Sequence, residues 1–449
     1  MTSKPRVKEV SDTVDQYAGE FSSLLNNDYS NQVETLKKLR QSAMSRFTEL
    51  GFPTTKLEEW KNTNVDFIAK TYYNRSTAKD FDIDRKVIES HYIDGCHRIV
   101  FINGNYIPEY SSPAENLGSI EIKELRDINE KDSFYLGKTA NYHDHAFTAL
   151  NTAFMECGVF IRIPGSQKVA TPIQILYVMA PPENHLVYHL RNLIVAGQNS
   201  QAGVIEDYVG LDKNPYLTNV VTEIFAKENS QLNHVKLQRE DSHSDHISST
   251  HINQESNSTV NTFLFSSGGK LVRNNLNTIL NGEGAHCTMN GLNLANDQQH
   301  NDSHTILDHA KPNCTSSELY KGIFRDKSRG VFNGRIIVRK DSQKTDAKQS
   351  NNNLLLSNHT MVNSNPQLEI YADDVKCTHG STTGQLDEDA LFYLRTRGLD
   401  IKTAQLLMIH GFANELVDKI STTNVKGYVQ LLLDNWINVQ RTLRGKLEK

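Results

Sequence analysis

The sequence predicts a mainly β fold in which a repeated β-solenoid lies between a largely helical N-terminal domain and a helical C-terminal domain. Three observations predict this fold. Similar turns recur through the middle of the chain, helical periodicity is confined to the two ends, and the hydrophobic content of 37% is low for 449 residues. A chain of this length exceeds what one hydrophobic core usually organises, whereas a solenoid needs only a narrow core along its axis.

The composition disfavours several classes of protein. Tyr and Phe number 17 each and the net charge is −5, so the mean hydropathy of −0.53 indicates much polar surface and not disorder. Basic residues form no stripe, so we expect no nucleic-acid partner. No apolar run approaches the ~20 residues that span a bilayer, and the polar segment 1–10 does not have the pattern of a signal peptide. We therefore expect a soluble, cytoplasmic protein with no membrane partner.

Residues 1–155 are predicted to form the mostly helical N-terminal domain, with a small β element. Apolar residues recur at helical spacing from Val33 to Ala43, and the sequence Gly51-Phe52-Pro53 then ends the helix. Residues 98–107 have the pattern of a tight hairpin that turns at Gly104-Asn105.

Residues 156–385 are predicted to form the solenoid, because Asn, Ser, Thr and Gly become frequent between short β-type runs that follow similar turns. The turns, roughly 26 to 30 residues apart, are Asn199-Ser200-Gln201, Asn229-Ser230-Gln231, Asn257-Ser258-Thr259, Glu283-Gly284-Ala285 and Asn313-Cys314-Thr315. This period is typical of solenoids, in which each coil pairs with the coils above and below it. The polar composition is also compatible with a β-sandwich, which is the alternative fold.

Residues 386–449 are predicted to form three amphipathic helices that pack together. Asp387 and Asp400 precede two of them as expected N-caps, and Gly398 separates the two. The third is expected from Val425 to Leu443. We expect the apolar side chains of the second helix to divide between a domain core and a partner contact: Leu406, Leu407, Ile409 and Phe412.

The cysteines and nucleotide motifs give no sign of a resident cofactor. Five widely spaced cysteines (Cys96, Cys157, Cys287, Cys314 and Cys377) form no CxxC pair, which disfavours a structural zinc site, a thioredoxin-like motif or a preformed ferredoxin-type cluster. The chain also lacks the GxxxxGK[ST] loop that holds nucleotide phosphates. We expect most of the cysteines to be reduced and buried, and no cofactor to be tightly bound to the isolated chain.

Three segments carry a resemblance to a known family. Residues 373–387 (DDVKCTHGSTTGQLD) resemble the signature at the end of the SufD β-helix, and residues 391–398 (LFYLRTRG) resemble the opening of the C-terminal helical domain of the SufB/SufD family. Residues 53–61 (PTTKLEEWK) resemble a short motif of SufD N-terminal domains. Gly380 stands where SufB-type chains usually carry an acidic residue beside the histidine, and this favours the SufD type.

The resemblance implies a right-handed parallel β-helix and a non-enzymatic scaffold role in the SUF system of iron–sulfur cluster assembly. It implies pairing with a SufB-type sister subunit through the C-terminal end of the β-helix, where an unpaired sheet edge is a template for another chain. It also implies that the C-terminal helices receive a SufC-type ATPase, giving a SufBCD complex, and that the isolated chain could form a homodimer. Any iron–sulfur cluster or iron would be held transiently in the complex.

His379 and Cys377 are the candidate metal ligands, for a nascent iron–sulfur cluster or for iron at the SufB interface. A neutral imidazole ligates iron, and iron–sulfur centres with both thiolate and imidazole ligands are known. By the resemblance, His379 faces the sister subunit and donates one ligand. Residues i and i+2 of a strand share a face, so the two side chains would lie together. The alternatives are a hydrogen-bonded structural histidine and a buried small cysteine.

Other histidines occur in groups, for which a structural role is the simpler explanation. Asp144, between His143 and His145, is expected to cap a helix near residues 144–155. His286 and Cys287 would point to opposite faces of a strand. The remaining groups are His243, His246 and His251, and His300, His304 and His309. With 17 histidines in the chain such groups arise readily by chance, and no metal is assigned to them.

Two other functions stay open. One is a SufB-like homodimeric scaffold without a separate sister subunit, although no Cys-rich segment could hold a full cluster alone. The other is a polysaccharide-active enzyme on a β-helix, which would need clustered carboxylates or a calcium-supported base in a groove. The sequence shows no compact acidic cluster on a recurring strand.

Overall fold

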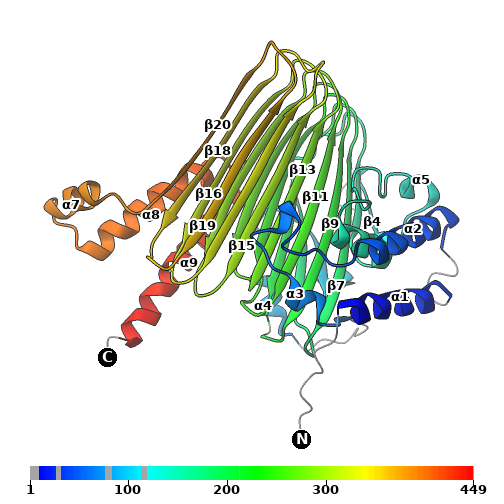
Figure 1. Ribbon diagram of the computed structural model, residues 1–449, viewed down its shortest axis with the longest axis horizontal. Coiled ribbons are helices and arrows are strands. Elements are labelled where there is room, and N and C mark those ends of the chain that lie inside the picture. The colour runs from blue at the N-terminus through cyan, green and yellow to red at the C-terminus, as the bar shows by residue number, and fades with distance from the viewer. Residues whose placement is uncertain (1–9, 27–31, 76–82, 113–118, 212, 448–449) are drawn as a thin grey trace, which may run out of the picture.

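The computed structural model describes residues 10–26, 32–75, 83–112, 119–211 and 213–447. Two ten-stranded sheets lie face to face and form a β-solenoid, with helices at both ends of the chain (Figure 1). From β5 onward the chain alternates between the sheets, so that one contains the odd-numbered strands and the other the even-numbered strands. The fourteen strands from β7 to β20, two to a coil, make about seven coils. The predicted fold class is confirmed, and the parallel pairing of these strands excludes an antiparallel sandwich.

The N-terminal part contains short elements around two long helices. Its helices are α1 (Val10–Asn26), α2 (Glu34–Leu50), α3 (Asp66–Ala69), α4 (Arg85–Glu89), α5 (Glu130–Ser133) and α6 (Ala146–Phe154). Its strands are β1 (Asn74–Arg75), β2 (His97–Ile102), β3 (Asn105–Tyr106) and β4 (Glu121–Glu124). Gly51, at φ 61°, ends α2 where the sequence predicts it.

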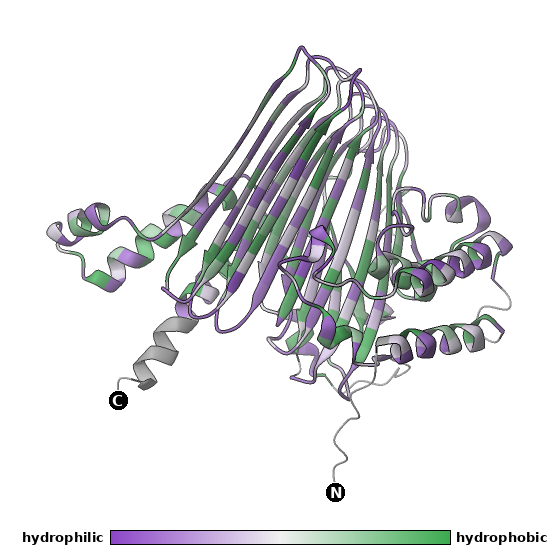
Figure 2. Ribbon diagram, viewed as in Figure 1, coloured by the Kyte–Doolittle hydropathy of each residue, from purple (hydrophilic) through white to green (hydrophobic). Residues whose placement is uncertain are grey.

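The solenoid strands are mostly nine to eleven residues long. The odd-numbered strands are β5 (Val159–Ile163), β7 (Leu186–Ala196), β9 (Tyr216–Ala226), β11 (Asp245–Gln254), β13 (Leu271–Leu280), β15 (His300–His309), β17 (Arg329–Val338) and β19 (Met361–Ile370). The even-numbered strands are β6 (Ile173–Met179), β8 (Gln201–Gly210), β10 (Gln231–Arg239), β12 (Thr259–Ser267), β14 (His286–Ala295), β16 (Thr315–Phe324), β18 (Asp346–Leu355) and β20 (Lys376–Gly384). Polar and apolar residues alternate along many of them, as Figure 2 shows.

The repeated turns set the period of the solenoid. Each contains one residue in the left-handed region, two positions before an even-numbered strand. These residues are Asn199, Asn229, Asn257, Gly284 and Asn313, with φ between 55° and 70°. Gly and Asn tolerate this conformation better than other residues do. The Asn229 side-chain amide also donates to Asn199 Oδ1 of the preceding coil at 3.0 Å, so the turns stack as well as bend the chain.

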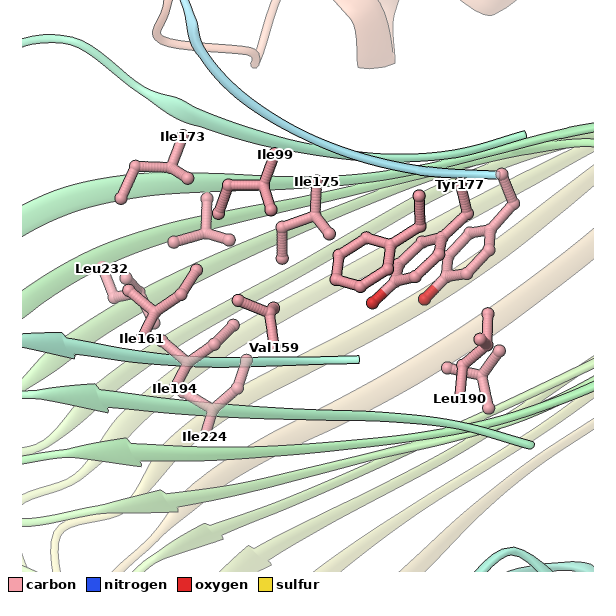
Figure 3. Packing of buried hydrophobic residues seen from close by; sticks show 14 of the residues in the cluster. Ile99, Val159, Ile161, Ile173, Ile175, Tyr177, Leu190, Ile194, Ile224 and Leu232 are labelled. Carbon is pink, nitrogen blue, oxygen red and sulfur yellow. The ribbon is translucent and has the colours of Figure 1, made fainter. Parts of the chain in front are cut away.

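The solenoid interior is apolar in its first coils and contains polar groups further along. In Figure 3, Ile173 and Ile175 of β6 point across the interior toward Ile194 of β7 and Ile224 of β9. Deeper in, the buried Glu206 carboxylate contacts His234 Nε2 at 2.8 Å. Buried charges need such partners. The interior of the solenoid is therefore stabilised by paired polar groups as well as by apolar packing, which fits the low hydrophobic content of the chain.

The N-terminal part closes one end of the solenoid. Antiparallel β4 covers β5, and β2, with its antiparallel partner β3, continues the even-numbered sheet beside β6. The hairpin turns at Asn103-Gly104, one residue before the predicted position, because these two residues have positive φ. The predicted cap at Asp144 is wrong. His145 is the residue before α6, and the Asp144 carboxylate accepts a hydrogen bond from Asn141 instead.

The C-terminal helices are α7 (Glu388–Thr396), α8 (Ile401–Val417) and α9 (Thr423–Leu447). Asp387 caps α7 by accepting from Ala390 N, and Asp400 caps α8 by accepting from Lys402 N, as predicted. Helices α8 and α9 pack on the outer face of the even-numbered sheet. The side chains of Val439 and Leu443 lie outside the described residues. In the described part of the chain, membrane-spanning length and apolarity do not coincide in any helix.

Candidate functional site

The last strand of the even-numbered sheet, β20, leaves one side of its backbone open. It pairs with β18 only, in the part of the chain that the structure describes. Lys376 N donates to Thr345 O at 2.8 Å, so the even-numbered N–H groups of β20 face β18. In a parallel strand alternate residues bond to opposite sides. The N–H groups of Cys377, His379, Ser381 and Thr383 therefore point toward the open side, which is ready to pair with another strand.

The neighbouring edge strand, β19, is a poorer template. Met361 N donates to Ser328 O and Tyr371 N to Val338 O, so the odd-numbered N–H groups of β19 face β17. Pro366 occupies an even position, where a donor would face the open side. Proline at this position removes no hydrogen bond within the sheet, but it interrupts the outward row of N–H donors. Proteins commonly use proline in this way to prevent an edge strand from pairing with another chain. Of the two open edges, β20 has the uninterrupted one.

His379 and Cys377 share the inner face of β20. His379 is exposed and lies in register beside the buried Gln349 of β18, whereas Cys377 is partly buried beside Ala347. Cys377 packs against the apolar cluster inside the last coils. The strand therefore brings the two predicted ligands to one face, with the imidazole more accessible than the thiol.

The electrostatics of the two donors differ. Burial, and then the nearby Asp346 carboxylate, raise the pKa of the Cys377 thiol. The environment therefore disfavours the thiolate, which is the form that binds a metal. Within the described residues, no group of three or more His, Cys, Asp or Glu side chains could hold a metal ion. His379 and Cys377 thus form a pair of donors without a third among those residues.

The other histidine groups are separated by the fold. His246 is buried in the interior, 2.6 Å from Glu240, whereas His243 is exposed beside Asp241. His251 is buried on the outer face of the odd-numbered sheet, and burial lowers its pKa to about 3. Neighbours in sequence therefore do not share a site.

The second group divides only in part. On the outer face of β15, His304 Nε2 lies 3.0 Å from Asp302, and His300 Nε2 lies 3.0 Å from Thr63 Oγ1, which donates to the same carboxylate. His309 lies apart from both, is buried, and contacts Ser316 Oγ at 2.9 Å. His286 is paired with Thr315, and the adjacent Cys287 is fully buried in the interior, so the two point to opposite faces as predicted.

The motif at residues 53–61 is anchored on the outer face of the odd-numbered sheet. The buried Arg273 guanidinium stacks 4.2 Å from the centre of the Trp60 ring and donates to Glu59 O at 2.8 Å. It also pairs with Asp302 at 2.7 Å, and Thr63 donates to the same carboxylate. The sequence analysis missed this network, because residues 59–63 lie more than 200 residues from Arg273 and Asp302 in sequence.

Helix α7 presents an unusual surface, since none of its residues is buried. Phe392 is 68% exposed and Tyr393 is 56% exposed. In α8, Ile409 is buried whereas Leu407 is 49% exposed. Figure 1 shows α7 standing away from the solenoid, next to α8. The apolar residues of this region divide between a core and an open face.

A solenoid that is closed at its N-terminal end and carries an open strand and an exposed apolar helix at its other end defines a class of protein suited to assembly with other chains. Two family models match most of the sequence: "SufBD protein N-terminal region" over residues 11–175 and "SUF system FeS cluster assembly, SufBD core domain" over residues 178–412. The chain belongs to the SufBD family.

Proteins of similar sequence support this family assignment. An iron–sulfur cluster assembly SufBD family protein of Synechocystis is 31% identical over 86% of this chain and 88% of its own length. The iron–sulfur cluster assembly protein SufD of Escherichia coli is 31% identical, over 87% of this chain and 90% of its own length. The Bacillus subtilis protein of the same name is 25% identical, over 87% and 91%.

Proposed function

We propose that this chain is a SufD-type, non-catalytic scaffold subunit of a SUF iron–sulfur cluster assembly complex. It pairs with a SufB-type sister subunit through the open side of β20 and receives a SufC-type ATPase on α7 and α8. The observation that carries this proposal is the uninterrupted row of outward N–H groups on β20, with the exposed His379 in the same strand. The SufD proteins among its relatives support the assignment.

The chemistry of the site fits a transient cargo better than a resident cofactor. His379 supplies one imidazole nitrogen, and Cys377 supplies a thiolate once its proton is lost. Two donors leave coordination positions for sulfide and for ligands of the sister subunit. A nascent cluster or an incoming iron ion would thus be shared across the β20 interface and could be released when the two subunits move apart.

The exposed face of α7 fits the ATPase contact. Phe392 and Tyr393 place two aromatic rings in solvent on a helix that buries none of its own residues, and Arg395 lies on the same exposed helix. Exposed aromatic side chains with a neighbouring arginine are typical of protein–protein contacts. The ATPase supplies the nucleotide chemistry for which this sequence has no phosphate-binding loop.

Two proline substitutions test the pairing. Ser381→Pro removes an outward N–H of β20, and Ser364→Pro removes an outward N–H of β19. Both also remove the 2.7 Å hydrogen bond between the two serine hydroxyls, and Ser364→Pro removes in addition the 2.7 Å hydrogen bond that Ser364 donates to Asn351, so the control loses at least as many internal contacts as the test variant. After anaerobic co-expression with the sister subunit and the ATPase, native mass spectrometry is expected to show the complex with Ser364→Pro but not with Ser381→Pro. Equal assembly of both variants would contradict pairing through β20.

The ligand role of His379 is tested separately. In the purified complex, His379→Ala is expected to leave the subunit composition unchanged while iron and acid-labile sulfide retained after reconstitution fall several-fold. Normal iron and sulfide content would refute the ligand role and leave the scaffold role intact. A chain that forms only homodimers in the presence of the sister subunit would favour the homodimeric scaffold instead.

A further inference from the structure

A buried amide lies directly beneath His379. Gln349 of β18 is 3% exposed and is the register neighbour of His379, on the inner face of the same sheet. Its Nε2 donates to Glu318 Oε2 of β16, one coil further in, at 2.8 Å. An ionised carboxylate can only accept hydrogen bonds, so with Glu318 ionised this contact fixes which end of the amide faces inward.

The other end of the amide lacks a partner. Gln349 Oε1 is buried and has no hydrogen-bond donor in the described part of the chain. Nε2 contacts Glu318 of the preceding coil, and His379 is the register neighbour of Gln349 on the opposite side of β18. A buried acceptor without a hydrogen bond is destabilising, so a donor that reaches this oxygen would be favoured.

The surroundings hold the amide in this orientation. Glu318 is 2% exposed and accepts a second hydrogen bond, from Thr305 Oγ1 at 2.5 Å, which anchors its carboxylate. Gly334 of β17 makes room for the amide, because a Cβ at that position would lie 2.4 Å from Gln349 Nε2. Thr305, Glu318 and Gln349 thus form a fixed chain of hydrogen bonds that ends in an acceptor beside His379.

We propose that Gln349 is a positioning residue for His379, whose imidazole donates one ring N–H to Gln349 Oε1 and presents its other nitrogen to the metal. This inference rests on the proposed ligand role of His379. Metal-binding histidines commonly donate their second nitrogen to a fixed acceptor, which selects the tautomer and the ring orientation, and loss of that acceptor typically lowers metal affinity about 10–100-fold. Free of such a contact, an exposed imidazole samples both tautomers and several rotamers.

Three variants separate positioning from general packing. Gln349→Leu removes the acceptor at nearly constant volume. The double variant Gln349→Glu/Glu318→Gln exchanges the two groups and preserves the chain, because the amide at position 318 then accepts from Thr305 and donates to the carboxylate at position 349, whose second oxygen faces His379. Asn293→Leu is the matched control. Asn293, on β14 and three coils away from β20, is also a buried amide with an unpartnered oxygen, and its Nδ2 donates to Ser303 at 3.1 Å.

The first measurement uses the full-length chain without metal. Ring ¹⁵N–¹H correlation spectra of ¹⁵N-histidine-labelled protein report the tautomer of His379, whose signals are assigned by their loss in His379→Asn. One dominant tautomer is expected in the wild type, in Asn293→Leu and in the double variant, and a mixture in Gln349→Leu. An unchanged His379 tautomer in Gln349→Leu would overturn the proposal. If Gln349→Leu does not fold, Gln349→Met provides the same test.

The second measurement is anaerobic titration with Co²⁺, for the full-length chain and its complex with the sister subunit. Affinity is expected to fall about 10–100-fold in Gln349→Leu, to recover in the double variant and to stay unchanged in Asn293→Leu. Equal affinity of wild type and Gln349→Leu would overturn the proposal for the metal-bound state. Co²⁺ binding that ignores His379→Asn, with the tautomer still dependent on Gln349, would instead refute the ligand role and keep the hydrogen bond.

Discussion

Single buried side chains join parts of this chain that are far apart in sequence, and Arg273 is the clearest case. Its guanidinium lies between the Trp60 ring, the Glu59 carbonyl and the Asp302 carboxylate, and it is 2% exposed. Burial alone would raise the pKa of Asp302, but the Arg273 charge, followed by the charge and hydrogen bond of His304, holds it well below its usual range. The stability of the contact between the motif at 53–61 and the solenoid should therefore depend on this residue.

Arg273→Met is expected to destabilise the protein by about 3–5 kcal/mol, because it leaves the buried Asp302 carboxylate without its guanidinium partner. Urea unfolding followed by tryptophan fluorescence checks this, since Trp60 reports on the site. Arg335→Met is the control. Arg335 is 35% exposed and 3.5 Å from Glu369, so its loss should cost less than about 1 kcal/mol. Similar losses for both variants would contradict the assigned difference in burial.

The Asp245 carboxyl makes the free energy of unfolding change with pH in the opposite direction to the change that paired carboxylates cause. Burial raises its pKa to about 7, and its Oδ1 has no partner among the described residues. The folded protein therefore keeps this proton over a range in which the unfolded chain, with an ordinary pKa of about 3.9, has lost it. Stability from this group is greatest below about pH 4 and falls as the pH rises to about 7.

Asp245→Asn should remove this dependence. Its stability relative to the wild type is expected to rise between pH 5 and pH 8, by an amount on the order of 1–3 kcal/mol. Urea midpoints of both proteins at the two pH values provide the measurement. Glu318, whose pKa burial also raises to about 7, is present in both proteins, so the difference isolates Asp245. A constant difference between the proteins would show that Asp245 is ionised throughout.

At the scale of the element, the repeated turn is the unit that makes this fold. Asn229 combines a left-handed backbone, at φ 56°, with a side-chain hydrogen bond to the turn of the preceding coil. The backbone requirement is local and the hydrogen bond is not, so substitutions can separate the two.

Asn229→Ala is expected to cost about 1–2 kcal/mol, because alanine disfavours the left-handed region. Asn229→Gly loses the same side chain without that strain and should cost less. Asn233→Ala removes an equivalent amide contact, the 3.0 Å hydrogen bond that Asn261 donates to Asn233, from a strand with ordinary backbone angles. Thermal unfolding midpoints of the three variants rank the effects. Equal midpoints for the alanine and glycine variants at 229 would remove the backbone explanation.

At the scale of the whole molecule, the helices at the two ends do different things. The N-terminal part covers the first strands, whereas α8 and α9 cover the outer face of the even-numbered sheet and leave β20 open. Val235, Leu237 and Phe265 lie on this outer face and are buried in one cluster with apolar residues of α8 and α9. Helix α7 makes no comparable contribution, because none of its residues is buried.

Ending the chain at Gly384 should therefore expose an apolar sheet face, raise the binding of a hydrophobic dye and lower the unfolding midpoint. Replacing residues 388–398 by a Gly-Ser linker, which removes α7 but keeps α8 and α9, should leave both properties close to wild type. If the chain ending at Gly384 kept the wild-type unfolding midpoint and dye binding, the C-terminal helices would not be needed to cover the solenoid.

Much of this organisation was predictable because it depends on nearby residues. Asn199, Asn229 and Asn257 mark turns through their own backbone preference, and Asp387 and Asp400 cap helices within three residues. Their physics is local, so periodicity and capping alone indicated a solenoid followed by helices. The Asp144 cap failed because α6 begins at Ala146, with His145 as the residue before it, and the Asp144 side chain accepts a hydrogen bond from Asn141.

The sequence by itself determined the solenoid class, the places of its turns, the caps of α7 and α8, and the shared face of Cys377 and His379, since each follows from spacing within a few residues. Only the tertiary structure decided that Trp60 stacks on Arg273, that Pro366 blunts β19 while β20 stays open, and that Gln349 lies beneath His379. These contacts depend on the register between coils. Register is the sum of every strand and turn length before it, and no local preference encodes that sum.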